Sequence, residues 1–225
     1  MKTDSRIVVT ADGSHSVYHP VFAQHYHSIF GAWQESQRVF IELGLEEAFR
    51  RFDDDLFVFE MGFGTGLNAL LTAREAGTRQ RPVFYTAVEA YPLPMADAQQ
   101  LNFDTLLGTN YLSLLHEAPW DGLTEIHSYF TLTKRQGLLQ DIATGDTLPG
   151  RFHLVYYDAF APEAQPELWT EDIFKQIAAL LRPGGLLVTY CSKGYVQRNL
   201  KAAGFSVEKH PGPARKREVL RAVLK

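Results

Sequence analysis

The chain has 225 residues, of which 45% are hydrophobic and 21% are charged, and its formal net charge is −4 at pH 7. These values are typical of an ordinary soluble globule with one large α/β domain, with or without a small addition. They give no sign of a membrane protein, because no apolar run approaches the roughly 18 residues that a spanning helix needs, and no apolar core of a signal peptide follows Met1.

The charge is unevenly distributed along the chain. Residues 193–225 hold nine Lys and Arg against two acids, a balance of +7, whereas residues 1–192 carry a balance of −11. A basic segment on an acidic body is expected where a protein contacts phosphates; a solvated basic face without a partner is the alternative. The one cysteine, Cys191, cannot form an internal disulfide and fits a reducing, cytoplasmic compartment.

Residues 1–50 are predicted to form an N-terminal extension, and residues 51–225 the main domain. Residues 7–10 and 16–19 flank Ala11-Asp12-Gly13, which predicts a hairpin. A helix is expected through about Leu43, with Gly44 as its C-cap. His25 and His27 lie two apart without further metal-ligand partners, so we expect no metal site.

The most informative stretch is a strand at residues 56–59 that runs into a glycine turn and then into a helix from Leu67 to about Arg74. The turn is G-x-G-x-G, formed by Gly62, Gly64 and Gly66, whereas the dinucleotide fingerprint is G-x-G-x-x-G. Glu60 before it would repel a diphosphate and suits the amino and sulfonium charges of S-adenosylmethionine. The pattern resembles motif I of the class I methyltransferases; a glycine turn without a ligand is the alternative.

Two further carboxylates follow strands. Residues 83–88 form an apolar run, and Glu89 stands 23 positions after Gly66, where doubly wound folds place an acid on the ribose hydroxyls of an adenosine. A surface acid at a strand end is the alternative. Residues 152–157 form another strand, and Asp158 at its end is the expected substrate-facing acid, unless it only caps the loop.

The remaining elements complete the expected fold. The class predicted is a class I S-adenosylmethionine-dependent methyltransferase: a Rossmann-like, seven-stranded, mostly parallel sheet with a C-terminal antiparallel strand, plus the N-terminal extension. The expected elements are a helix opening at 92–94, a strand at 129–134, helices ending at Ile142 and spanning 168–181, a strand at 186–191, a helix at 194–203, and strands at 205–209 and 218–224.

A more specific resemblance covers nearly the whole chain. The chain is similar to the tRNA (5-methylaminomethyl-2-thiouridine) methyltransferase family, comprising MnmD proteins and the methyltransferase half of bifunctional MnmC. The D-x-F-A-P loop at 158–162, S-K-G and K-R-E are far more specific than motif I. The residues that carry the resemblance are 12–14, 26–28, 35–36, 60–68, 158–162, Trp169, 191–194 and 216–218.

Two departures from the family pattern are visible. Ala159 stands where the fused members have Gly, and 212–215 replaces the usual G-F-G before K-R-E. Because the chain ends at Lys225, we expect no flavin-dependent oxidase half and no FAD site in it.

The resemblance implies the reaction and its residues. The acceptor would be the amine of 5-aminomethyl-(2-thio)uridine at the tRNA wobble position, and Asp158 would orient that amine and help it lose its proton. S-adenosylmethionine would be bound by Glu60, Gly62, Gly64, Gly66, Asn68, Glu89 and Asp158.

The RNA would be held by two kinds of side chain. Tyr26, Phe160 and Trp169 are candidates to stack on the unstacked uridine, although each is also a plausible core residue. Phosphates would be held by Lys193, Arg198, Lys216 and Arg217.

Other functional classes remain open. An aminopropyltransferase, or a methyltransferase that acts on a small amine, shares the fold, but its narrow acidic pocket would not need the +7 segment. A non-catalytic RNA-binding module would not need an intact cofactor motif with Asp158. A nicotinamide dehydrogenase is disfavoured by the G-x-G-x-G spacing and by the lack of a Tyr-x-x-x-Lys pair.

Overall fold

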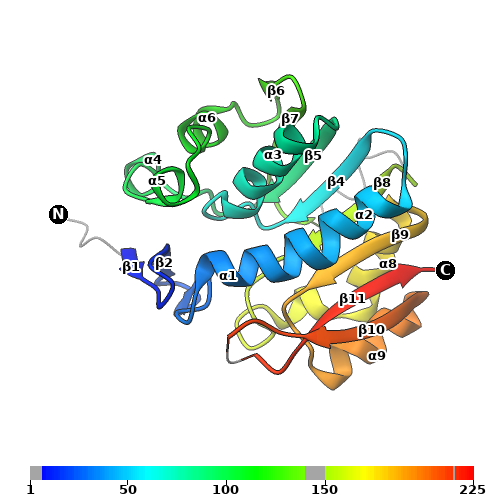
Figure 1. Ribbon diagram of the computed structural model, residues 1–225. Coiled ribbons are helices and arrows are strands. Elements are labelled where there is room, and N and C mark those ends of the chain that lie inside the picture. The colour runs from blue at the N-terminus through cyan, green and yellow to red at the C-terminus, as the bar shows by residue number, and fades with distance from the viewer. Residues whose placement is uncertain (1–6, 140–149, 215) are drawn as a thin grey trace.

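The computed structural model describes residues 7–139, 150–214 and 216–225 (Figure 1). Its centre is a mixed eight-stranded sheet in the order β10-β11-β9-β8-β4-β5-β7-β6. The five middle strands run parallel, and β11, β10 and β6 are antiparallel to their neighbours. The strands are β4 (Leu56–Met61), β5 (Val83–Glu89), β6 (Leu123–His127), β7 (Phe130–Gln136), β8 (Phe152–Tyr157), β9 (Leu181–Thr189), β10 (Phe205–Pro211) and β11 (Glu218–Leu224).

The predicted Rossmann-like sheet with its C-terminal antiparallel strand is therefore confirmed, with eight strands where seven were expected. The additional strand is β6, which pairs with β7 at the edge of the sheet. Only Ile126 of β6 is buried, so its sequence lacks the apolar run by which the other strands were recognised.

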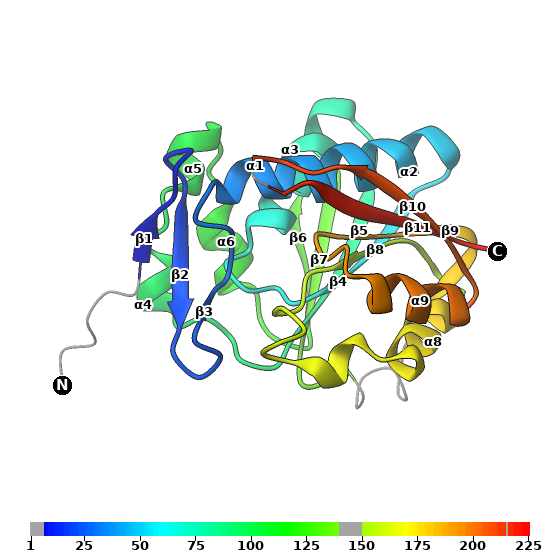
Figure 2. The same ribbon diagram turned by 90° about the horizontal axis from the view of Figure 1, so that it is seen from below.

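Helices cover both faces of the sheet (Figure 2). Side chains alternate along each strand, so that Val58 and Tyr156 belong to one apolar core and Phe59 and Tyr157 to the other. The first core lies under α3 (Leu67–Arg79) and a long helical run, and the second lies under α8 (Glu171–Leu180) and α9 (Gly194–Ala202).

The long helical run passes through residue 44 without a break. It consists of α1 (Ala32–Ser36), the π-helix η1 (Gln37–Leu45) and α2 (Glu46–Arg51). The prediction that Gly44 caps this helix is wrong: a Cβ on Gly44 would lie 3.0 Å from Val188 and 3.3 Å from Tyr156. The glycine instead lets the helix approach the sheet closely. The run packs on the main sheet and continues past residue 50. The predicted division between an extension at residues 1–50 and a domain at residues 51–225 stays a prediction.

The predicted N-terminal hairpin is confirmed. It forms a small antiparallel sheet of β1 (Ile7–Val9), β2 (His15–His19) and β3 (Gln24–His25). Asn102 fixes it to the main body, since its amide accepts from the His15 N–H at 3.0 Å and donates to the Gly13 carbonyl at 2.9 Å.

Other helices differ in detail from the expectation. Three short helices stand where one was expected after Pro94, and a 3₁₀ turn, η2, precedes α8. The three are α4 (Met95–Ala98), α5 (Phe103–Leu107) and α6 (Leu112–Glu117), and η2 is Pro166–Trp169. The helix expected to end at Ile142 lies partly outside the described residues. Within the described part of the chain, no helix combines the length and apolarity needed to cross a membrane.

Candidate active site

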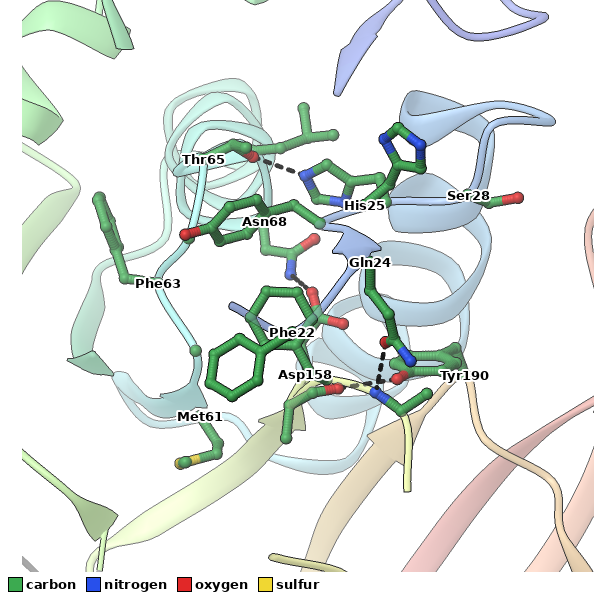
Figure 3. A pocket seen from close by; sticks show the side chains of 18 of the residues that line it. Phe22, Gln24, His25, Ser28, Met61, Phe63, Thr65, Asn68, Asp158 and Tyr190 are labelled. Carbon is green, nitrogen blue, oxygen red and sulfur yellow. Dashed lines mark hydrogen bonds between the residues drawn. The ribbon is translucent and has the colours of Figure 1, made fainter. Parts of the chain in front are cut away.

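A cavity of about 440 Å³ opens at the carboxyl ends of β4, β5 and β8, the edge at which doubly wound sheets bind ligands (Figure 3). Of the residues predicted for the site, it brings together eight: Tyr26, Gly62, Gly64, Asn68, Glu89, Asp158, Phe160 and Lys216. The predicted residues outside its lining are Glu60, Gly66, Trp169, Lys193, Arg198 and Arg217.

The glycine turn forms the floor of the cavity between β4 and α3. Gly62 and Gly64 have φ of +92° and +50°, a region that side chains disfavour. A Cβ on Gly62 would lie 2.7 Å from the Asp158 carbonyl oxygen, and one on Gly64 would lie 2.9 Å from the Tyr26 ring. The glycines therefore allow the turn to pass directly beneath two other segments of the site.

Asn68, in the first turn of α3, joins two acids. Its Nδ2 donates to Glu60 Oε1 at 3.0 Å and to Asp158 Oδ2 at 2.8 Å. Burial raises the pKa of Asp158 to about 7, and the charge of Glu35 adds to the rise, while the Asn68 bond and the charge of Lys216 oppose it. A carboxyl with a pKa near 7 is suited to exchanging a proton at neutral pH.

Glu60 lies below the cavity, outside its lining. Its side chain is buried at the end of β4, and burial, followed by the charge of Asp158, raises its pKa well above the usual range. Its Oε1 accepts from the Asn68 amide, and the contact of Glu60 with S-adenosylmethionine stays a prediction.

Glu89, at the end of β5, is directed at the glycine turn. Its Oε2 accepts from the Gly64 N–H at 2.9 Å, and its Oε1 accepts from the Tyr91 N–H at 2.8 Å. Each carboxylate oxygen can accept a second bond, so the side chain can brace the turn and still accept from a ribose. The ribose contact stays a prediction.

The N-terminal segment forms one wall of the cavity, with lining residues from Phe22 to Phe30. His27 Nε2 hydrogen-bonds the Thr65 hydroxyl at 2.6 Å, and burial lowers the pKa of His27 to about 4, so this histidine is neutral. Gln24 Oε1 accepts from the Ala161 N–H at 3.2 Å. These two bonds tie the N-terminal segment to the glycine turn and to the loop after Asp158. No such contact was predicted for this segment from the sequence, although His27 is one of the residues that carry the family resemblance.

Aromatic rings gather beside the Asp158 loop. Phe160 lies 4.7 Å from Phe22 and 5.2 Å from Tyr26, measured between ring centres. Trp169 does not join them: it is 1% exposed, and its Nε1 donates to the Phe160 carbonyl at 2.9 Å. Its predicted stacking on a base is therefore wrong for this arrangement, because the ring supports the loop from the core.

The predicted basic residues take different positions. Lys216 lines the cavity and forms an ion pair with Glu35 of α1, so it does not lie on the outer surface as expected for a phosphate contact. Lys193 forms an ion pair with Glu163, and Arg198 and Arg217 are exposed. Phosphate binding by these last three stays a prediction. The cavity residues that sequence reasoning did not assign include Glu35, Gln24 and Tyr190.

The groups at this site fit S-adenosylmethionine. Asn68 Oδ1 is buried and has no hydrogen-bond partner among the described residues, so the lining offers an acceptor for an ammonium group. The glycine turn offers room for close backbone approach, and Glu89 offers a carboxylate. The described residues contain no group of three His, Cys, Asp or Glu arranged to hold a metal ion.

Comparison with known protein sequences gives related proteins. A family model described as an S-adenosyl-L-methionine-dependent methyltransferase matches residues 124–225. The chain is 32% identical over 217 residues to the tRNA 5-methylaminomethyl-2-thiouridine biosynthesis bifunctional protein MnmC of Pseudomonas savastanoi pv. phaseolicola, covering 90% of the chain and 32% of that protein. MnmC of Pseudoalteromonas atlantica is 32% identical over 219 residues, with 88% and 31% covered. The chain thus spans about a third of the length of these curated relatives.

Comparison of folds agrees. The crystal structure of MNMC2 from Aquifex aeolicus matches with a TM-score of 0.76 and 26% identity, covering 100% of this chain and 72% of that one. Spermidine synthase from Thermotoga maritima matches with a TM-score of 0.56 and 12% identity, covering 97% and 72%, which is a likeness of fold alone.

Proposed function

Because the chain belongs to the MnmC methyltransferase-like family, we propose that it transfers the methyl group of S-adenosylmethionine to the amine of 5-aminomethyl-(2-thio)uridine at the tRNA wobble position. The observation that carries the proposal is Asp158, an acid with a pKa of about 7 placed beside the glycine turn in a cavity of about 440 Å³. The compartment that this reaction implies is the cytoplasm.

The protein's contribution is to position the amine and to accept its proton. Bound S-adenosylmethionine supplies an electrophilic methyl group on a sulfonium, which is already a good leaving group. An alkylamine is mostly ammonium at neutral pH and lacks a lone pair. Asp158 accepts a hydrogen bond from it and takes one proton, and the free amine is then held in line with the methyl carbon. Such alignment can supply about 7–11 kcal/mol in well-held cases.

The balance of the reaction is simple. The nitrogen lone pair forms the new N–C bond, the C–S bond breaks with its electrons going to sulfur, and S-adenosylhomocysteine and a secondary ammonium result. Asn68 keeps the Asp158 carboxyl in place during this step, since its amide donates to Oδ2 at 2.8 Å.

The test is transfer of labelled methyl to tRNA that carries the 5-aminomethyl group, with unmodified tRNA and putrescine as controls. Label confined to the modified tRNA and mapped to the wobble position is the expected result. Label in putrescine but not in tRNA would replace the proposal with the small-amine alternative.

The role of Asp158 is tested by Asp158→Asn, which keeps the shape and the bond to Asn68 but cannot take a proton. We expect turnover to fall by about 100-fold or more, which is the range for loss of a general base, with the dissociation constant for S-adenosylmethionine nearly unchanged. The matched control is Asp172→Asn, at a position in α8 whose side chain is 89% exposed. Retained turnover in Asp158→Asn would remove the residue from the chemistry.

A further inference from the structure

Glu35 is a third acid on the cavity wall, beside Glu89 and Asp158. It lies in α1, is 7% exposed, and lines the same cavity as Asp158. Its ionic partner is Lys216, which reaches in from the loop before β11. A buried carboxylate is costly unless a cation or several donors compensate it. In this structure the compensating cation of Glu35 is the ammonium group of Lys216.

Lys216 is only partly enclosed in that position. Its side chain remains 33% exposed, and its ammonium sits on a flexible four-carbon stem rather than in a rigid fork. The Nζ atom also lies 4.2 Å from the centre of the Tyr190 ring, a face that attracts cations. Tyr190 is itself fixed, because its hydroxyl donates to the Ala159 carbonyl at 2.8 Å.

The lysine head and the acceptor group have the same chemistry. Both are primary ammonium ions on a CH₂ group. Both can form an ion pair with a carboxylate and a cation–π contact with an aromatic ring. We propose that Glu35 is the specificity-determining carboxylate that binds the ammonium of the acceptor, and that Lys216 holds this place until the acceptor displaces it. The inference rests on the proposed function and deepens it.

The arrangement separates capture from chemistry. Glu35 attracts and orients the charged amine, and Asp158 on the neighbouring wall takes its proton. The charged or titratable groups that act on Asp158 come from several elements, so removing one of them shifts its titration without abolishing it. The groups whose charge shifts the pKa of Asp158 are Glu35 and Lys216, and the charge of Asp158 in turn raises the pKa of Glu60, Tyr85 and Tyr190.

The test compares two tRNAs that differ only in the aminomethyl group. Dissociation constants are measured with S-adenosylhomocysteine present for the wild type and for Glu35→Gln. We expect the wild type to prefer the aminomethyl tRNA by about tenfold or more, the value of one charge-assisted hydrogen bond, and Glu35→Gln to lose that preference. Affinity of Glu35→Gln for the unmodified tRNA and for the cofactor should stay within about twofold of the wild type, a margin far below one such bond.

Two further variants separate recognition from folding. Glu42→Gln removes an exposed acid of the same helical run, which pairs with Arg38, and should keep the preference. Lys216→Met removes the ammonium group that the acceptor would displace, and this variant should also keep the preference for the aminomethyl tRNA. Preserved preference in Glu35→Gln, or loss of the preference in Lys216→Met, would overturn the inference.

A second readout is the pH dependence of turnover. Glu35 raises the pKa of Asp158, so the acid limb of kcat/KM should move to lower pH in Glu35→Gln if the two acids act on the same bound amine. Should the wild type fail to methylate aminomethyl tRNA at all, the proposed function fails; should it methylate that tRNA with no change in Glu35→Gln, only this inference fails.

Discussion

The amide of Asn68 bonds two carboxyl groups, that of the buried Glu60 and that of Asp158, which lines the cavity. The positions of both acids could be predicted from the sequence, because each ends a strand at the edge where parallel strands bind ligands. Their protonation could not, because the pKa of Asp158 depends on Glu35 and Lys216, which reach the cavity from distant parts of the chain. Lys216 was predicted to contact phosphate because the sequence alone does not show that its side chain reaches the cavity and pairs with Glu35.

Titration of Asp158 should make stability depend on pH. Its pKa is raised from 3.8 to about 7 in the folded protein, so the folded state binds the proton more tightly, and ionisation destabilises the fold as pH rises. Asp158→Asn removes this cost. The variant's thermal midpoint should therefore exceed that of the wild type by more at pH 8 than at pH 5.

The matching measurement is Asp172→Asn, whose exposed side chain should give a difference from the wild type that is nearly the same at both pH values. A constant difference for Asp158→Asn as well would contradict the raised pKa.

At the scale of elements, the strands that carry the site were predictable and their surroundings were not. β4 and β8 are apolar runs buried on both faces, β5 is buried fully on one face and partly on the other, and the glycine turn marks the start of α3. The π-helix η1 gives no local signal that separates it from an α-helix, so Gly44 resembled an end where the helix in fact continues. Its closeness to Val188 arises only when the helix meets the sheet.

Filling the contact at Gly44 should destabilise the protein. A side chain there begins 3.0 Å from Val188 and 3.3 Å from Tyr156, both held in the sheet, so Gly44→Val overpacks the interface. We expect a loss of about 1–3 kcal/mol in the free energy of unfolding, measured by denaturant titration. Glu46→Val, at an exposed position of the same helical run, should change it by no more than about 0.5 kcal/mol, and an equal loss in both variants would count against the packing explanation.

At the scale of the whole molecule, acidic side chains neutralise part of the excess positive charge of residues 193–225. Within residues 193–225, Lys193, Lys209, Lys216 and Arg221 form ion pairs with acids, whereas Arg198 and Arg217 are exposed. A charge count along the sequence cannot show this pairing, because the acids that neutralise the lysines include Glu35 and Glu163 from the first 192 residues.

Binding of tRNA should therefore weaken with salt, and these two arginines should carry part of the effect. Each of Arg198→Gln and Arg217→Gln should reduce the slope of log affinity against log salt by about 0.7–0.9, the value for one phosphate contact. Fluorescence anisotropy at several salt concentrations measures the slope. Lys175→Gln, in α8 outside the basic segment, should leave it unchanged; a slope unaltered by either arginine would exclude them from the phosphate contacts.

The two tight glycines of the turn differ in what confines them, and this has a consequence for evolution. The space at Gly62 is closed by the main chain of Asp158, and no substitution elsewhere can remove a carbonyl oxygen. The space at Gly64 is closed by the ring of Tyr26, which a smaller residue could vacate. Among descendants of a common ancestor with this fold, position 62 should stay invariant, while any change at position 64 should be accompanied by a change at position 26.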